Sequence, residues 1–219
     1  MVNCLLCESS KTAYFTVKNK PARGYFHCEY CDLIFMNPSE RLHPQEEKAR
    51  YDLHQNQDSS EYRQFLQPLV QEIQNHGRSM AIPPETLKIL DYGCGPTAFL
   101  SALLAENSFK AVNYDLFYFP DTFSLQATYD VITCTEVWEH LHHPYDEITR
   151  LHQLLKPSGL LAVMTASHPG VELFHHWHYR RDLTHVIFFS DKTMRWIGAH
   201  FHLELCKAQT PYWFFRKRS

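Results

Sequence analysis

The stretch ILDYGCGPTAFL, residues 89–100, decides the fold of this chain. An apolar run through Asp91 predicts a short buried strand, and the run PTAFLSALLAEN after it predicts a helix. Gly93 and Gly95 lie between the two, where glycine permits a sharp turn and brings the backbone close to a ligand at the helix N-terminus. A purely structural turn would use the same two glycines, so this motif alone leaves the ligand open.

Strand and helix patterns alternate from residue 87 onward. This order predicts a parallel sheet with helices on both faces. A late helix is expected to begin at Ser190, which suits an N-cap, and two strands follow it. The segments after the first helix are KAVNYD, YDVITC, PYDEITRLHQLLK, LLAVMT, SDKTMRWIGAHF, HLELC and PYWFF.

A second acidic residue favours a ligand at the glycine turn. Asp115 ends the predicted strand AVNYD, twenty residues after Gly95. An acid at this strand end can accept hydrogen bonds from both ribose hydroxyls of an adenosine cofactor. The glycine turn and its two acids therefore predict a cofactor site at this end of the sheet.

Four segments in the same order resemble the class I S-adenosylmethionine-dependent methyltransferases: LDYGCG, VNYD, YDVITCTEVWEHL and LHQLLKPSGLLAVMT. The resemblance covers about residues 87–219 and implies an enzyme with a Rossmann-like α/β core that uses S-adenosylmethionine. A nicotinamide dehydrogenase is disfavoured, because GCGPTA lacks the third glycine of the GxGxxG pattern. The donor contacts that the resemblance implies are Asp91, Tyr92, Gly93, Gly95, Asp115, Leu116 and Thr135.

One segment departs from the family pattern. Only fourteen residues separate Asp115 from Asp130, where the family places a helix, a third strand and an acid that contacts the adenine amine. We therefore expect a trimmed sheet, and we do not carry over the family's adenine contact. Phe117 lies in this short segment and offers an aromatic ring for the adenine instead.

Four cysteines near the N-terminus have the spacing of a zinc site. Cys4, Cys7, Cys28 and Cys31 form two CxxC pairs separated by twenty residues. Each pair places two thiolates on one tight knuckle, and two knuckles complete a tetrahedron around Zn²⁺. Four protein ligands leave no position for water, so this zinc is expected to be structural. Disulfides or unbound thiols are the alternative, and the reduced thiols of a cytoplasmic protein disfavour them.

The division that these motifs predict has three parts. Residues 1–37 form a zinc ribbon, residues 38–80 a helical cap or linker, and residues 81–219 the methyltransferase core. The cap contains a probable amphipathic helix in EYRQFLQPLVQEI, interrupted by Pro68. In similar zinc-ribbon methyltransferases such a segment folds over the donor, which implies contacts from Tyr51, His54 and Tyr62. An exposed polar helix is the alternative.

The stretch TEVWEHL, residues 135–141, follows the fourth strand of the family pattern. In a helix, Glu136, Glu139 and His140 would share one face. HYRRDLTHVIFFS resembles the segment in which two groups of metal-assisted O-methyltransferases supply a later histidine, here His185. That resemblance implies that Glu136, Glu139, His140 and His185 are catalytic and hold a divalent cation such as Mg²⁺.

Two other interpretations of this cluster stay open. Without a cation, His140 or His185 can act as proton acceptor, oriented by a glutamate. A structural role is the third interpretation, since acids favour a helix start. The remaining polar residues of these segments are expected at the surface: His142 and His143 in a solvated turn, and Arg180 in exposed salt bridges.

Composition limits the partners. The net charge of −3 and a pI near 6.6 give no basic surface for nucleic acid. No signal peptide or membrane-spanning run is present, so we expect a cytoplasmic enzyme with a small-molecule acceptor, and the residues leave the oligomeric state open. Aromatic residues near Trp177 and Phe188 suit a flat or apolar acceptor. The favoured reaction is methylation of a hydroxyl; an RNA-modifying methyltransferase and a non-catalytic donor-binding adaptor are the alternatives.

Overall fold

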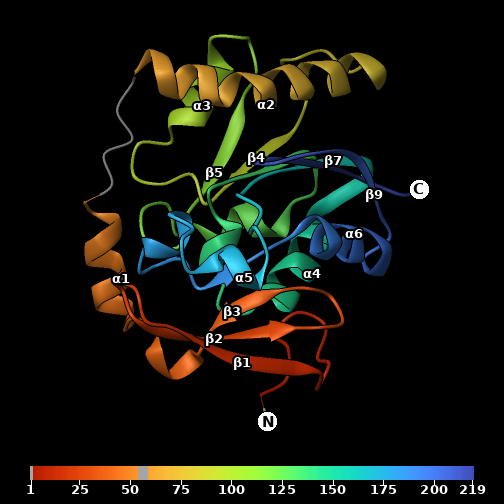
Figure 1. Cartoon of the computed structure of the whole chain (residues 1–219). Coiled ribbons are helices and arrows are strands. Elements are labelled where there is room, and N and C mark those ends of the chain that lie inside the picture. The colour runs from red at the N-terminus through yellow and green to blue at the C-terminus, as the bar shows by residue number, and fades with distance from the viewer. Residues whose placement is uncertain (1, 54–58) are drawn as a thin grey trace.

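The central layer of the protein is a six-stranded sheet with strand order β5-β4-β6-β7-β10-β9 (Figure 1). The computed structural model describes residues 2–53 and 59–219. Strands β4 and β6 of the sheet are covered on both faces, so nearly all of their residues are buried and most are apolar. The sheet consists of β4 (Ile89–Tyr92), β5 (Ala111–Tyr114), β6 (Tyr129–Thr135), β7 (Leu155–Met164), β9 (Leu203–Gln209) and β10 (Tyr212–Lys217).

The sheet is parallel only in part. The pairs β4–β5, β4–β6 and β6–β7 are parallel as predicted, whereas β10 runs antiparallel to both β7 and β9. The two late strands, for which the sequence predicted no direction, are antiparallel to each other because the turn that joins β9 to β10 is too short for a crossover connection.

The expected trimming of the sheet is confirmed at the opposite edge. Strand β5 pairs only with β4, and a single 3-10 turn, Thr122–Gln126, is the element between β5 and β6. Fourteen residues cannot hold a helix and a strand that return to the same edge of a sheet. The carboxyl end of β5 is therefore left open for the pocket described below.

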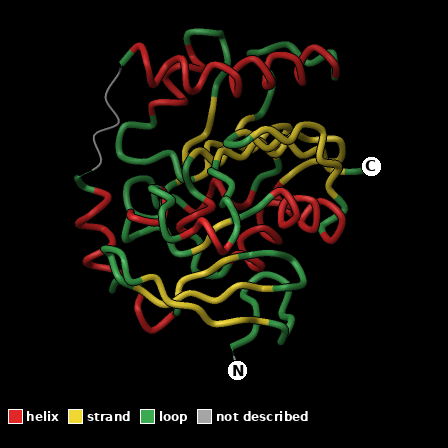
Figure 2. Tube along the Cα trace, viewed as in Figure 1, coloured by secondary structure: helices red, strands yellow, loops and turns green. Residues whose placement is uncertain are grey.

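Helices cover both faces of the sheet (Figures 1 and 2). On one face, α2 (Ser60–Ser79) and α3 (Phe99–Ala105) bury leucines such as Leu66 and Leu103 in one apolar cluster. On the other face, α4 (Pro144–Leu154) and α6 (Asp191–His200) bury Ile148 and Ile197 in a second cluster. Pro68 lies inside α2 without ending it, and Ser190 caps α6 as predicted.

The N-terminal segment forms a second sheet with strand order β1-β2-β3-β8. Three of its strands, β1 (Thr12–Val17), β2 (Arg23–Cys28) and β3 (Ile34–Met36), come from the predicted ribbon. The fourth, β8 (Ile187–Phe188), comes from the methyltransferase part and pairs antiparallel with β3. Both parts also contribute residues to one apolar cluster, so the ribbon packs directly on the core.

In the described residues of the cap segment, α2 is preceded by a shorter α-helix, α1 (Pro44–Tyr51). Helix α1 lies beside the ribbon in Figure 1 and is preceded by a 3-10 turn, Pro38–Glu40. Among the helices in the described residues, none has the length and apolar character needed to cross a bilayer.

Candidate functional site

A cavity of about 730 Å³ opens at the carboxyl ends of β4, β5 and β6. This is the position where open α/β sheets bind ligands, and the volume suits a cofactor together with a small substrate. Nine of the ten predicted donor contacts line it, and the tenth, His54, lies outside the described residues. The nine are Asp91, Tyr92, Gly93, Gly95, Asp115, Leu116, Thr135, Tyr51 and Tyr62.

The glycine turn has two different requirements for glycine. Gly93 has φ +75° and donates its N–H to the Tyr114 carbonyl at 2.7 Å, and a Cβ there would lie 2.4 Å from Val137. Gly95 has φ +66°, and a Cβ there would meet nothing within 4 Å. The first glycine is therefore needed for packing, while the second leaves open space at the cavity wall.

Asp91 is a buried carboxylate, only 1% exposed, at the end of β4. Its Oδ1 accepts a hydrogen bond of 2.9 Å from the Thr133 hydroxyl, and its Oδ2 has no partner among the described residues. The Ser101 hydroxyl donates to Asn113 and also lies close enough to Asp91 to lower its pKa. Burial is the main cause that raises the pKa of Asp91 to about 7, and the Thr133 bond opposes this effect. Because Asp91 lines the cavity, a ligand there could donate a hydrogen bond to its Oδ2 atom.

Asp115 holds the backbone on both sides of the cavity entrance. Its Oδ2 accepts from the Gly95 N–H at 3.0 Å, and its Oδ1 accepts from the N–H groups of Phe117 and Tyr118 at 2.9 and 3.1 Å. These bonds place Phe117 in the cavity lining. The Asp115 carboxylate therefore positions the glycine turn. It also lines the part of the cavity where the ribose is predicted to bind.

Helix α1 covers one side of the cavity. The Tyr51 ring lies 5.6 Å from that of Phe117 between centroids, and its hydroxyl donates to Glu47 at 2.9 Å. The Tyr118 hydroxyl donates to Asp52 at 2.7 Å, which joins the end of α1 to the segment after β5. Aromatic rings thus enclose the part of the cavity nearest Asp115, where the adenine was expected.

The stretch TEVWEHL does not form the predicted α-helix. Strand β6 ends at Thr135, Glu136 takes a left-handed conformation with φ +53°, and only one 3-10 turn, Trp138–His140, follows. The Glu136 N–H bonds to the Met164 carbonyl at 2.9 Å, which extends the sheet pairing by one residue and prevents a helix from starting there. The prediction that helical spacing aligns Glu136 with Glu139 was therefore wrong.

The two glutamates nevertheless meet through Tyr179. The Tyr179 hydroxyl bonds to Glu136 Oε2 at 3.0 Å and also to Glu139 Oε1. Glu139 is fully buried, and its Oε2 has no partner among the described residues. Burial raises the pKa of both glutamates, and for Glu136 the neighbouring Glu139 raises it further. One hydroxyl proton cannot serve two carboxylates, so this group needs a shared proton or a cation.

Glu139, His140 and His185 converge although His185 is far away in the sequence. One ligand atom from each of the three lies within 4.8 Å of the others. His140 Nδ1 bonds to the Thr184 carbonyl at 3.0 Å and His185 Nδ1 to the Tyr179 carbonyl at 2.7 Å. A carbonyl only accepts, so each Nδ1 carries the proton and each Nε2 is the acceptor nitrogen. Two imidazoles and a carboxylate are a donor set that suits a divalent cation.

Glu136 is not a member of this three-residue group, although it lines the same cavity. Three of the four residues predicted to act together therefore share a point, and the fourth is linked to them through Tyr179. No pattern in the sequence indicated Tyr179 as a bridge, because its contact partners lie about forty positions away.

Sequence reasoning was only partly right about the other polar residues. His142 and His143 lie in the turn before α4 as expected, and His143 is exposed, but both also line the cavity, where His142 lies 3.4 Å from Glu47 of α1. Arg180 is 1% exposed and donates to backbone carbonyls, not to exposed acids. The aromatic residues expected around an apolar acceptor are not in the cavity lining: Phe188 is a core residue and Trp177 packs on it.

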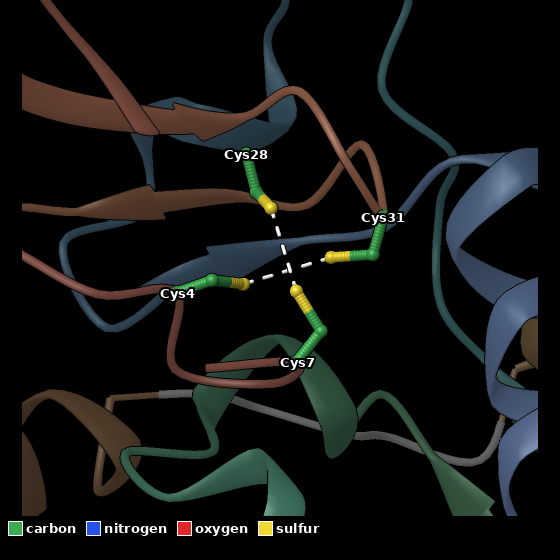
Figure 3. Close-up of side chains that lie close together, drawn as sticks. All are labelled: Cys4, Cys7, Cys28 and Cys31. Carbon is green, nitrogen blue, oxygen red and sulfur yellow. Dashed lines mark hydrogen bonds between the residues drawn. The ribbon is translucent and has the colours of Figure 1, made fainter. Parts of the chain in front are cut away.

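The four ribbon cysteines form one cluster (Figure 3). Their sulfur atoms point toward a common centre, with Cys4 and Cys31 at 3.6 Å and Cys7 and Cys28 at 3.5 Å. Sulfurs bound to zinc at about 2.3 Å in a tetrahedron lie about 3.8 Å apart, so the four thiols need little movement to hold the ion. The cluster fits a structural zinc site.

Comparison with known proteins gives a family-model match. Residues 31–208 match the model described as a methyltransferase domain. No curated protein matches the sequence. The magnesium protoporphyrin IX methyltransferase of Synechocystis PCC 6803, solved with bound SAM, has a TM-score of 0.50 and 14% identity over 80% of this chain and 91% of that chain.

Two solved structures from Burkholderia thailandensis are also similar. The 1,6-didemethyltoxoflavin-N1-methyltransferase, with bound S-adenosylhomocysteine, has a TM-score of 0.49 and 13% identity, covering 88% of this chain and 99% of that chain. An O-methyltransferase family protein has a TM-score of 0.48 and 14% identity, covering 81% and 61%. Of the three structures, the Synechocystis enzyme, with a TM-score of 0.50, supports the fold, and at 14% identity it supports the fold alone.

Proposed function

Because the chain belongs to the family of this methyltransferase domain, we propose that it transfers a methyl group from S-adenosylmethionine to a hydroxyl of an uncharged small molecule. The observation that carries the proposal is that one cavity is lined both by the acids of the glycine turn and by His140 and His185. A donor and an acceptor bound there would face each other inside one enclosed space.

The donor end of the cavity has groups that suit each part of S-adenosylmethionine. Asp91 Oδ2 offers a buried acceptor without a partner, and Asp115 lies at the position expected for the ribose. Tyr51 and Phe117 offer flat rings for the adenine. The donor would supply a methyl group made electrophilic by a sulfonium, so the chain needs only to orient the acceptor and remove one proton.

The acceptor end has groups that can remove that proton. Each Nε2 of His140 and His185 is an acceptor by its tautomer, and Glu139 lies within reach of both. In the metal version, Glu139, His140 and His185 would hold a divalent cation such as Mg²⁺, which lowers the pKa of a bound hydroxyl. In the version without metal, one histidine is the base and a glutamate orients it.

The charges around the cavity favour an uncharged acceptor. Six carboxylic acids and four histidines line it, and none of its described lining residues is lysine or arginine. In the version without metal, a phosphate or carboxylate on the acceptor would meet these acids and no lysine or arginine. This speaks against the RNA alternative. The basic C-terminus adds no positive charge to the cavity at Lys217, because this residue lies outside the cavity lining and donates to the carbonyls of His152 and Leu155.

Calorimetry with S-adenosylhomocysteine tests the donor site first. We expect a Kd in the micromolar range. Absence of binding below millimolar concentration would contradict the proposal that the chain is a methyltransferase. Transfer of a labelled methyl group to a panel of polyols and phenols, each paired with its phosphorylated form, tests the acceptor class. Glu139→Gln should abolish transfer, while Glu204→Gln on the exposed face of β9 should not. Transfer to the phosphorylated forms alone would contradict the proposal.

A further inference from the structure

We propose that the zinc ribbon positions the acceptor half of the active site, and that the donor half is independent of it. This proposal rests on the proposed function, because the terms donor half and acceptor half come from it. The donor half is the glycine turn with Asp91 and Asp115, and the acceptor half is the group Glu139, His140 and His185. The sequence leaves open whether the ribbon docks a partner or covers the active site, and the contacts of residues 179–188 connect it to the acceptor half.

The donor half is held by bonds within the six-stranded sheet and its loops. Gly93 bonds to the Tyr114 carbonyl, Gly95 to Asp115, and Asp91 accepts from Thr133. These bonds involve no residue of the ribbon. Its geometry therefore follows from the pairing of β4 with β5 and β6.

The acceptor half depends on residues 179–188 instead. The imidazoles of His140 and His185 bond to the carbonyls of Thr184 and Tyr179, and the Tyr179 hydroxyl holds Glu139. Each of the three acceptor residues thus takes its orientation from this one segment. If the segment moves, all three lose their alignment together.

Arg180 anchors the start of this segment to the ribbon. Its guanidinium donates to the carbonyls of Pro21 at 3.1 Å and Asn19 at 3.5 Å, in the turn between β1 and β2, and to that of His175 at 2.9 Å. The side chain is 1% exposed. A buried charge that loses such partners is strongly destabilised, so Arg180 can stay in place only while the ribbon turn is there.

The end of the segment is a strand of the ribbon sheet. In β8, Phe188 pairs with Ile34 and Ile187 pairs with Phe35. Next to this pair, the Met36 N–H bonds to the Val186 carbonyl at 2.8 Å, and the Val186 N–H bonds to the Glu139 carbonyl at 2.8 Å. Two backbone bonds therefore connect β3 to the residue that carries the central carboxylate.

The cysteine cluster determines where β3 begins. Cys28 and Cys31 form the knuckle between β2 and β3, and the Cys28 N–H bonds to the Leu33 carbonyl at 2.8 Å. Many small metal-binding modules fold only with their metal, because the ligands hold the chain together. Without zinc, β3 and the β1–β2 turn lose their support, and the anchors of residues 179–188 are lost with them.

Hydrogen exchange of the full chain, read by mass spectrometry, tests this division. In Arg180→Gln, amide exchange should rise at least about tenfold in residues 179–188 and 136–141 and change by less than about twofold in residues 89–95. The Kd of S-adenosylhomocysteine should also change by less than about twofold. Arg181→Gln is the matched control, since Arg181 is the exposed neighbour. Arg180→Lys should recover part of the protection.

Zinc removal with a chelator gives a second measurement that needs no mutation. It should reproduce the Arg180→Gln pattern, and added zinc should reverse it. Unchanged exchange in residues 179–188 in both experiments would overturn the proposal, and so would loss of S-adenosylhomocysteine binding together with the acceptor half. If the wild-type chain fails to bind S-adenosylhomocysteine, the proposed function is wrong while the exchange pattern still decides the role of the ribbon.

Discussion

Replacing Asp91 by asparagine should change stability in a way that depends on pH. Burial raises the pKa of Asp91 to about 7, from 3.8 in an exposed aspartate. Below the lower value the carboxyl is protonated in the folded and unfolded states, and its ionisation has no effect. Between the two values only the unfolded state loses the proton, so the wild type loses stability as pH rises toward 7. Asparagine does not ionise, and the Asp91→Asn variant escapes this loss.

The size of the effect follows from the shift. Three pKa units correspond to about 4 kcal/mol of destabilisation at pH 8 as an upper bound, and to about 2 kcal/mol at pH 5.5. The asparagine amide replaces Oδ2, which has no partner, and a buried donor without a partner costs about 1–3 kcal/mol. The variant should therefore be about as stable as wild type at pH 5.5, and about 1–3 kcal/mol more stable at pH 8.

Binding should change in the opposite direction. If Asp91 accepts a hydrogen bond from the donor, loss of its charge weakens S-adenosylhomocysteine by about 1.5–3 kcal/mol, or about 10–150-fold in Kd. The variant would then be more stable and less functional, as expected for a group kept for its ligand.

Urea unfolding of the zinc-loaded protein at both pH values, without ligand, measures the stability difference, and calorimetry measures the affinity. Asp121→Asn, an exposed acid at the start of a 3-10 turn, is the control and should show neither effect. If the stability difference between Asp91→Asn and wild type is the same at both pH values, Asp91 is not desolvated and the reasoning is refuted. Unchanged affinity would refute its role at the donor site.

Three further outcomes follow from the site. Asp115→Ala should weaken S-adenosylhomocysteine by about 1.5–3 kcal/mol in calorimetry, because it removes charged hydrogen bonds, whereas equal affinity would show that the ribose assignment is wrong. Tyr179→Phe should destabilise the protein by about 1–3 kcal/mol in urea unfolding, because the buried Glu139 and the half-buried Glu136 lose their common donor. Tyr145→Phe, at the surface, should be neutral, and equal effects of the two would argue against the bridge. Elemental analysis should find one zinc per chain after purification under reducing conditions, and Cys31→Ser should lower that content; protein without zinc would contradict the assignment.

Local patterns in the sequence were enough for the elements of the core, and they predicted donor contacts that line one cavity in the structure. The glycine turn, Asp115 and the two CxxC pairs act through neighbours in the chain or through strands in a known order, so their spacing carries the information. The trimmed sheet also followed from length alone, since fourteen residues exclude a further strand and its crossover helix.

The acceptor site was only partly readable. Resemblance brought Glu139, His140 and His185 together, but the assumed helix over residues 135–141 does not exist. A single hydrogen bond from Glu136 to Met164 keeps the chain in strand pairing there, and that bond depends on the position of β7. Helical spacing predicts a shared face only where the chain forms a helix. Here the bond to β7 holds Glu136 at the end of the sheet, and no α-helix forms.

The sequence by itself determined the strand and helix pattern of the core and the spacing of the glycine turn and of the four cysteines, because residue type and spacing encode them; the roles of the site residues stay predictions. Only the tertiary structure decided how those residues are held: Tyr179 between two glutamates, Arg180 buried against the ribbon turn, and β8 as a strand of the ribbon sheet. These contacts join positions forty to more than one hundred and fifty residues apart. Packing of whole elements creates such contacts, and a buried polar group is stable only with partners that the fold supplies, so no local pattern announces them.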